Sequence, residues 1–171
     1  MPMGKLKQDS FRISADVRDA VLAFVPRSLQ DPKEMPWPSL TGLSGELVID
    51  RQQLQVKNAK ARSAELPRLL VSAVDVLIPD LTKTEVKVNG QIKGPLADAF
   101  KLMSNTALAP LIDDALASAT GAGEADVKLA LNLPVADMAK STVRGSVTLA
   151  GNDLQISRNS PKLSRTKGVL N

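Results

Sequence analysis

The sequence predicts an α+β fold that is mainly antiparallel β, a curved open sheet or β-groove built of repeated hairpins, with one short helical pair at about residues 95–119. Three observations predict it: segments in which apolar and polar residues alternate, a pattern that recurs along the chain, and one stretch with helical spacing. The 171 residues suffice for a single domain with a core, or for a slice of a longer repeating β-groove.

The alternation is strictest in residues 85–94 and 124–134. Side chains on a strand point alternately to opposite faces, so each segment reads as a strand with one polar and one apolar face. Antiparallel pairing is the expected arrangement for such strands. The apolar positions include Val86, Val88, Ile92, Val127, Leu129 and Leu131.

The recurring pattern links residues 43–56 to residues 143–156, in register and without gaps. Each copy predicts a β-hairpin, and Gly151-Asn152-Asp153 has the composition of a turn. A looser third copy, residues 11–24, predicts another hairpin with its turn at Arg18-Asp19. The apolar positions of these copies include Ile13, Val17, Leu47, Ile49, Val147 and Leu149.

The helical insert follows Gly94-Pro95, where Leu96, Ala99, Phe100 and Met103 have the spacing of one helix face. A second short helix is predicted around residues 108–116, with Pro110 in its first turn.

Two further segments depart from the simple strand pattern. Residues 31–38 contain three prolines and predict an extended crossover loop, with Trp37 docked against the body of the protein. In residues 70–78 both the odd and the even positions are largely apolar, so the sequence pattern leaves open which face of this strand points inward.

The composition argues against an enzyme. The chain has no Cys and no His, which removes the usual thiolate nucleophile, imidazole base and zinc ligands. Ser44 in Gly42-Leu-Ser-Gly45 lacks the spacing of a nucleophile elbow and a base to activate it. Asp113 and Asp114 are adjacent on a predicted helix and point in different directions. We therefore predict no catalytic residue, no metal site and no cofactor.

The net charge of +4 suggests nucleic acid as a binding partner. However, the cationic residues do not cluster, and few aromatic side chains are present on which bases could stack. A solvated surface is the favoured interpretation, and no nucleic-acid partner is predicted. The chain shows neither a signal peptide nor an apolar run of the roughly 20 residues that a membrane-spanning helix needs.

The apolar face of the predicted sheet must be covered, because burying one aliphatic side chain is worth ~1.5 to 3 kcal/mol. The helical pair could cover it as an ordinary core, or part of it could stay open for acyl chains or for the next module. Pattern and composition alone favour the core.

Four segments stand out when taken in order: Trp37–Leu47 (WPSLTGLSGEL), Lys93–Ala99 (KGPLADA), Leu108–Ile112 (LAPLI) and Val143–Leu154 (VRGSVTLAGNDL). Together they resemble the AsmA-like YhdP family of Gram-negative envelope proteins. The resemblance, which runs from about Phe11 to Lys167, implies a membrane anchor followed by a long periplasmic β-groove that moves phospholipid between the inner and outer membranes.

On this resemblance the chain is expected to be a periplasmic segment of an inner-membrane-anchored protein. Its expected partners are phospholipid acyl chains and the neighbouring β repeats of the full-length protein, with edge-strand self-association as a further possibility. The alternative is a structural or interaction β module that binds no ligand and pairs with protein through its sheet edges. The expected groove-lining residues are Ile13, Val17, Leu47, Ile49, Val86, Val88, Ile92, Val127, Leu129, Leu131, Val147 and Leu149.

Overall fold

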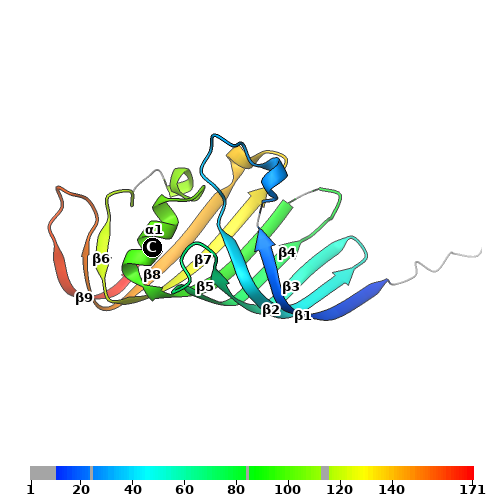
Figure 1. Ribbon diagram of the computed structural model, residues 1–171, viewed down its shortest axis with the longest axis horizontal. Coiled ribbons are helices and arrows are strands. Elements are labelled where there is room, and N and C mark those ends of the chain that lie inside the picture. Colours follow the sequence, from blue (N-terminus) through cyan, green and yellow to red (C-terminus); the bar gives the residue numbers. More distant parts are fainter. Residues whose placement is uncertain (1–10, 24, 84, 113–115) are drawn as a thin grey trace, which may run out of the picture.

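The computed structural model describes residues 11–23, 25–83, 85–112 and 116–171, and these form one curved antiparallel sheet (Figure 1). Its strands are β1 (Arg12–Ala23), β2 (Ser39–Asp50), β3 (Gln53–Ser63), β4 (Leu70–Ile78), β5 (Glu85–Pro95), β6 (Thr120–Ala122), β7 (Glu124–Pro134), β8 (Thr142–Gln155) and β9 (Leu163–Leu170). The helical elements are α1 (Leu96–Ser104) and the 3-10 turns η1 (Arg27–Leu29), η2 (Ala109–Ile112) and η3 (Met138–Lys140).

The strand order is β1-β2-β3-β4-β5-β7-β8. The short strand β6 pairs with the end of β8, on the same side of β8 as β7. Strand β9 pairs with the other side of β8. The sheet curls so that β1 and β9 lie at opposite ends and α1 sits inside the curve (Figure 1). The predicted fold class, a curved open antiparallel sheet with a short helical insert, is confirmed.

The strands predicted from strict alternation are confirmed. β5 and β7 pair antiparallel over their full lengths, from Glu85 opposite Pro134 to Pro95 opposite Glu124. The hairpin predicted at residues 43–56 is also confirmed, since Ile49 lies opposite Leu54 and the chain reverses at Arg51-Gln52. Arg51 has a φ of 56°, which the tight turn requires.

The other two predicted hairpins are wrong. β8 runs on through Gly151, and β1 runs on through Asp19; both residues have positive φ but sit at register shifts rather than at reversals. A β-bulge inserts an extra residue and bends a strand without turning it back. In β8 the side chain of Asn152 fixes the bulge, because its Oδ1 accepts a hydrogen bond of 2.9 Å from the Ala150 N–H.

A bulge also explains the ambiguous run in residues 70–78. Ala73 has a φ of 49° and lies at the register shift of β4 against β5. Val71 before it and Val74 after it are therefore both buried on the same side, although their spacing is odd, whereas Leu70 is 50% exposed. In β4, odd-numbered residues point inward before Ala73 and even-numbered residues point inward after it.

The described residues of the helical insert form one α-helix and one 3-10 turn. The predicted face of α1 is buried, with Leu96, Phe100 and Met103 all less than 8% exposed. Where the second helix is predicted, the structure describes the 3-10 turn η2, which has i+3 hydrogen bonds such as Leu111 N–H to the Leu108 carbonyl (3.0 Å) and in which Pro110 lacks a donor. Asp113, Asp114 and Ala115 lie outside the described residues.

The segment Val25–Pro38, which we call the strap, connects β1 to β2 and contains η1. Gln30 closes its loop, donating from Nε2 to the Val25 carbonyl (2.7 Å) and accepting at Oε1 from the Trp37 N–H (3.3 Å). The Pro36 carbonyl accepts from the Ala107 N–H (3.0 Å), and Trp37 packs against the main core. The strap therefore joins the β1 end of the sheet to the helical segment.

Along one line across the sheet, glycines lie very close to the neighbouring strand. Gly45 lies so close to β3 that an added Cβ would meet the Ala59 Cβ at 2.8 Å, and at Gly145 it would meet the Leu129 Cδ2 at 2.9 Å. Gly90 lies opposite Leu129 in the same line. Next to this line fall the register shifts of β3 and β4. Bulges and glycines together let the strands bend inward here.

Candidate functional site on the concave face

The concave face is the side of the sheet on which α1 lies. Residues directly opposite each other in an antiparallel pair share a face, so the register traces rows across the sheet. One row is Ala15, Leu47, Val56, Val76, Val88, Leu131 and Val143. The same tracing places all twelve predicted groove-lining residues on this face. That they contact acyl chains stays a prediction.

Burial divides the twelve residues into two groups. Val88, Ile92, Val127, Leu131 and Leu149 are buried in the core. The others are half-buried or exposed: Val17, Leu47, Ile49, Val86, Leu129, Val147 and, at 47% exposure, Ile13. The concave face is thus covered in one part and open in another.

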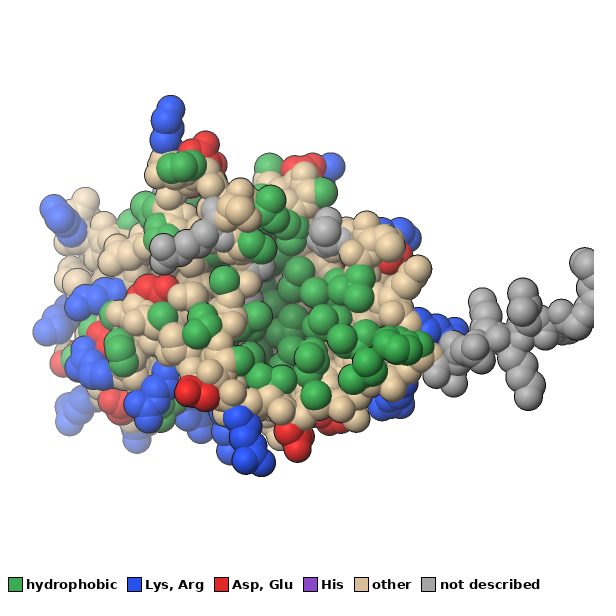
Figure 2. Space-filling model, turned by 45° about the vertical axis from the view of Figure 1, so that its right-hand side comes forward, with side chains coloured by type: hydrophobic (Ala, Val, Ile, Leu, Met, Phe, Trp, Pro, Cys, Tyr) green, Lys and Arg blue, Asp and Glu red, His purple; other side chains and the backbone are tan. Residues whose placement is uncertain are grey.

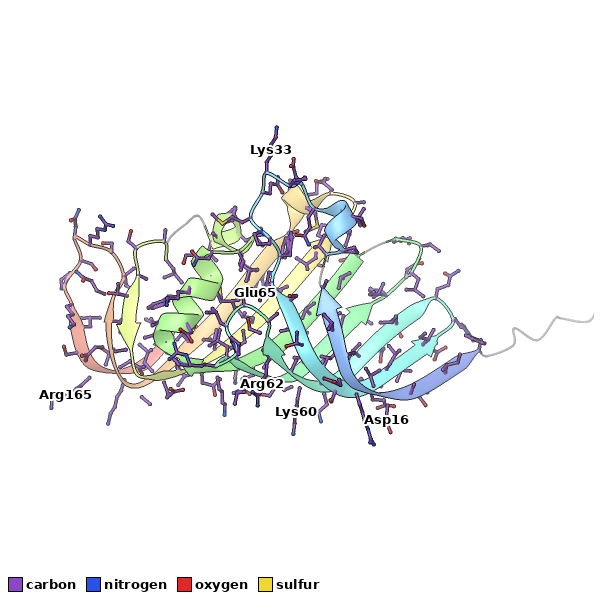
Figure 3. All side chains as sticks on the ribbon, in the orientation of Figure 1. Asp16, Lys33, Lys60, Arg62, Glu65 and Arg165 are labelled. Carbon is purple, nitrogen blue, oxygen red and sulfur yellow. The ribbon has the colours of Figure 1, made fainter. Side chains whose placement is uncertain are left out.

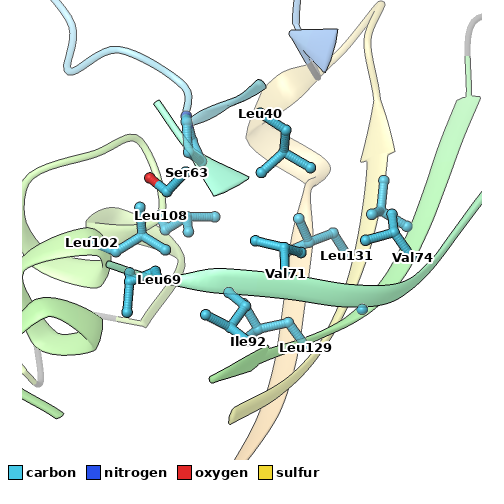
Figure 4. A pocket seen from close by; sticks show the side chains of 13 residues that line it. Leu40, Ser63, Leu69, Val71, Val74, Ile92, Leu102, Leu108, Leu129 and Leu131 are labelled. Carbon is cyan, nitrogen blue, oxygen red and sulfur yellow. The ribbon is translucent and has the colours of Figure 1, made fainter. Parts of the chain in front are cut away.

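The covered part lies beneath α1, η2 and the strap. Helix α1 contacts β5, β6 and β7, and its Leu96 and Phe100 pack with Ala125, Leu149 and Leu154 in a second core cluster. Figure 4 shows Leu102 and Leu108 of the helical segment facing Leu40 and Val71 across a small pocket. This pocket offers about 50 Å³ to water-sized molecules, whereas an apolar cavity that binds benzene measures about 150 Å³. It has no room for a lipid chain.

The open part lies along the edge where β2–β3, β4–β5 and β7–β8 connect, which we call the turn rim. The row of inward side chains nearest to it, the turn-rim row, comprises Ile13, Ile49, Leu54, Ile78, Val86 and Leu133. Of these only Leu133 is fully buried. Figure 2 shows apolar side chains gathered in a hollow that opens toward this side of the molecule.

Sequence reasoning missed several residues of this face. Leu54, Val56, Val71, Val74, Val76 and Ile78 point inward but lie in β3 and β4. Asn58 and Ala73 have positive φ and lie at β-bulges. Because a bulge breaks the two-residue alternation of side chains, the alternation in the sequence does not show which residues of these strands share a face. Leu54 and Val56 could have been found from the sequence, because they match Leu154 and Ile156 in the repeated pattern.

The charged and polar groups near this face have structural roles. Asp98 of α1, whose side chain is 3% exposed, pairs with Arg68 of the β3–β4 loop. Buried Ser63 donates to Glu65 (3.1 Å) and accepts from the Leu66 N–H (3.2 Å). The described part of the chain holds no group of three or more acidic side chains placed to bind a metal ion.

At the turn rim, Asp80 is held by Thr82. The Thr82 hydroxyl donates to the Asp80 Oδ1 (2.6 Å), and the Thr82 N–H donates to the same atom (2.9 Å). These hydrogen bonds, with Lys83 nearby, lower the pKa of Asp80 below its usual value. The carboxylate is therefore ionised at neutral pH.

No described helix has both the length and the apolar character needed to cross a bilayer. The fold and its concave face define an open antiparallel β-groove, part of whose interior is apolar and uncovered.

Comparison with known proteins assigns the family. The model of the family described as YhdP protein matches residues 1–171, so this chain belongs to the YhdP family, as the sequence resemblance implied. It is 27% identical over 152 residues to the Intermembrane phospholipid transporter YhdP of Escherichia coli (strain K12). That match covers 89% of this chain and 11% of the relative, so the chain spans about a ninth of the transporter's length. No solved structure matches the chain.

Proposed function

We propose that this chain is a periplasmic segment of an AsmA-like protein whose concave face binds and guides phospholipid acyl chains between the inner and outer membranes. The observation that carries the proposal is the turn-rim row, which stays apolar across β1 to β5 and is only partly buried there. Membership of the YhdP family supports it, since the matched E. coli relative is named a phospholipid transporter.

The binding would need no catalytic group and no cofactor. Acyl chains that lie on the face lose contact with water, which is favourable by roughly 25 cal/mol per Å² of apolar surface buried. The rows run across the strands rather than along them. Because adjacent strands lie about 4.8 Å apart, the turn-rim row provides a path of roughly 20 Å where it crosses β1 to β5.

The edges of the sheet support pairing with neighbouring β repeats of the full-length protein. Within the described ranges β1 pairs with β2 alone, and most of its residues are exposed. An unpaired edge strand invites another strand to extend the sheet. The same observation favours the alternative function, a β module that pairs with protein or with a second copy of itself and binds no lipid.

Lipid binding by the detergent-free protein separates the two functions. We would expose the protein to phosphatidylglycerol and count lipid adducts by native mass spectrometry. Ile49→Asp with Leu54→Asp places charge on the open part of the face and should abolish the adducts. The control is Leu70→Asp, at a convex position that is 50% exposed, which should retain them. Circular dichroism checks that each variant is folded. A wild-type protein without adducts would contradict the transport function.

A further inference from the structure

The turn rim carries one cation at each of its three connections. Arg51 lies in the β2–β3 turn, Lys83 in the β4–β5 loop and Lys140 in η3 between β7 and β8. We propose that these three side chains form a headgroup rim, in which each can bind the phosphate of a phospholipid whose acyl chains lie on the turn-rim row. The inference rests on the proposed function and assigns the polar half of the same ligand.

The register sets the spacing of the three cations. Leu54 at the start of β3 lies opposite Ile78 at the end of β4, and Glu85 at the start of β5 lies opposite Pro134 at the end of β7. All three connections therefore leave the same edge of the sheet. Each connection lies two strands from the next, so the connections that carry the cations recur at intervals of roughly 10 Å along the edge.

The cations also lie next to the apolar surface that they would serve. Arg51 follows Ile49 of the turn-rim row by two residues. The Leu81 N–H donates to the Gln52 carbonyl (2.7 Å), which joins the loop of Lys83 to the turn of Arg51, and Leu81 itself is 44% exposed. A lipid on this row would have its tails on apolar side chains and its phosphate beside a cation.

These cations can accept an anionic ligand. The side chains of Lys83 and Lys140 are 79% and 78% exposed. Their carboxylate partners lie at 3.6 Å (Asp80) and 2.8 Å (Asp137), and such exposed ion pairs are worth only about 0 to 1 kcal/mol. Asp80 keeps its hydrogen bonds from Thr82 when Lys83 moves. A phosphate therefore competes with weakly held partners.

The opposite edge of the sheet differs in this respect. There Arg68 is bound to buried Asp98, and Glu65 accepts hydrogen bonds from the Ser39 and Ser63 hydroxyls. The strap and α1 also cover the concave face on that side. Its charges hold the protein together, whereas Lys83 and Lys140 of the turn rim are exposed, and Arg51 and Lys83 lie beside the partly exposed part of the turn-rim row. This contrast points to the turn rim as the headgroup side.

The test compares two lipids with the same acyl chains, phosphatidylglycerol and diacylglycerol, because only the first carries a phosphate. Native mass spectrometry of an equimolar mixture gives the ratio of the two adducts. The rim variant is Arg51→Glu with Lys83→Glu and Lys140→Glu. The matched control is Lys60→Glu with Arg62→Glu and Lys128→Glu on the convex face, where Figure 3 shows Lys60 and Arg62 pointing away from α1. Both triple variants change the net charge equally.

The wild type and the control should favour phosphatidylglycerol, and the rim variant should lose at least about tenfold of that preference while still binding diacylglycerol. An unchanged preference in the rim variant, or an equal loss in the control, would overturn the inference and leave acyl binding intact. Absence of both adducts from the wild type would overturn the proposed function as well. Excess inorganic phosphate should not abolish the preference; if it does, the rim binds free phosphate rather than a lipid headgroup.

Discussion

Arg68 donates from Nη2 to the Oδ1 of Asp98 at 2.7 Å and so ties the β3–β4 loop to the first turn of α1. The two side chains differ in environment, since that of Asp98 is 3% exposed and that of Arg68 is 70% exposed. The N-terminal end of a helix favours a negative charge, which adds to the effect of the pair. The contact holds α1 over the covered part of the concave face.

Arg68→Met should therefore lower the free energy of unfolding by about 1–3 kcal/mol, because it leaves a buried carboxylate without its partner. Urea denaturation measures the change. Adding Asp98→Asn to Arg68→Met replaces the buried charge by a neutral amide, so the double variant should be more stable than the single one. A double variant that is less stable would show that the pair does not act in this way.

Gly45→Ala should lower the free energy of unfolding by about 1–3 kcal/mol, because the added methyl group has no room. Its Cβ would lie 2.8 Å from the Ala59 Cβ and 2.9 Å from the Ala59 Cα, so backbone would have to move. The control is Gly90→Ala, whose Cβ would meet only the Val74 Cγ2 at 3.6 Å. It should change stability by no more than about 0.5 kcal/mol. Equal effects would show that the bend does not depend on close approach at Gly45.

The fold was predictable from the sequence where strands stay regular. Unbroken alternation gave β5 and β7, and the helical spacing from Leu96 to Met103 gave α1. The bulges were not predictable, because a positive φ at Asp19 or Gly151 looks the same in sequence whether the chain bends or reverses. Only the pairing partner on the neighbouring strand decides between the two, and that partner is distant in sequence.

The concave face was predictable in part for the same reason. Residues such as Val88 and Leu131 belong to strands without bulges, so their side of the sheet followed from alternation alone. The inward side of β4 changes at Ala73, which no count of alternating residues shows. The division of the concave face into covered and open parts depends on where the strap crosses this face. The strap is held there by the hydrogen bond between Ala107 and Pro36, a tertiary contact that the local sequence does not show.

The turn-rim row should contribute little to stability. Ile13→Ser should change the free energy of unfolding by less than about 0.5 kcal/mol, because Ile13 is already 47% exposed. Leu133→Ala in the same row removes a side chain with 0% exposure and should cost about 2–5 kcal/mol. Chemical denaturation of both variants provides the comparison. A large loss from Ile13→Ser would mean that the open part of the row is core after all.

The pKa of Asp80 should rise toward its ordinary value in Thr82→Val, because the hydroxyl that donates to the carboxylate is lost. A depressed folded-state pKa stabilises the protein above the unfolded-state pKa, about 3.9 for Asp, and this contribution is lost as pH falls through the folded-state value. The stability difference between wild type and Thr82→Val should therefore shrink below about pH 4. Carboxyl NMR titration measures the pKa directly. An unchanged pKa in the variant would show that the hydroxyl has no effect on it.

Asn152→Asp should loosen the junction between β6 and β7. Asn152 is 2% exposed, and its Nδ2 donates to the carbonyls of Ala122 (3.1 Å) and Glu124 (2.8 Å). A carboxylate cannot donate to either carbonyl and would be buried beside them, so the free energy of unfolding should fall by about 1–3 kcal/mol. Amide hydrogen exchange should rise first in β6 and at the start of β7. Asn159→Asp, an exposed change of the same chemistry, should have no such effect. Equal behaviour of the two variants would show that Asn152 does not hold the junction.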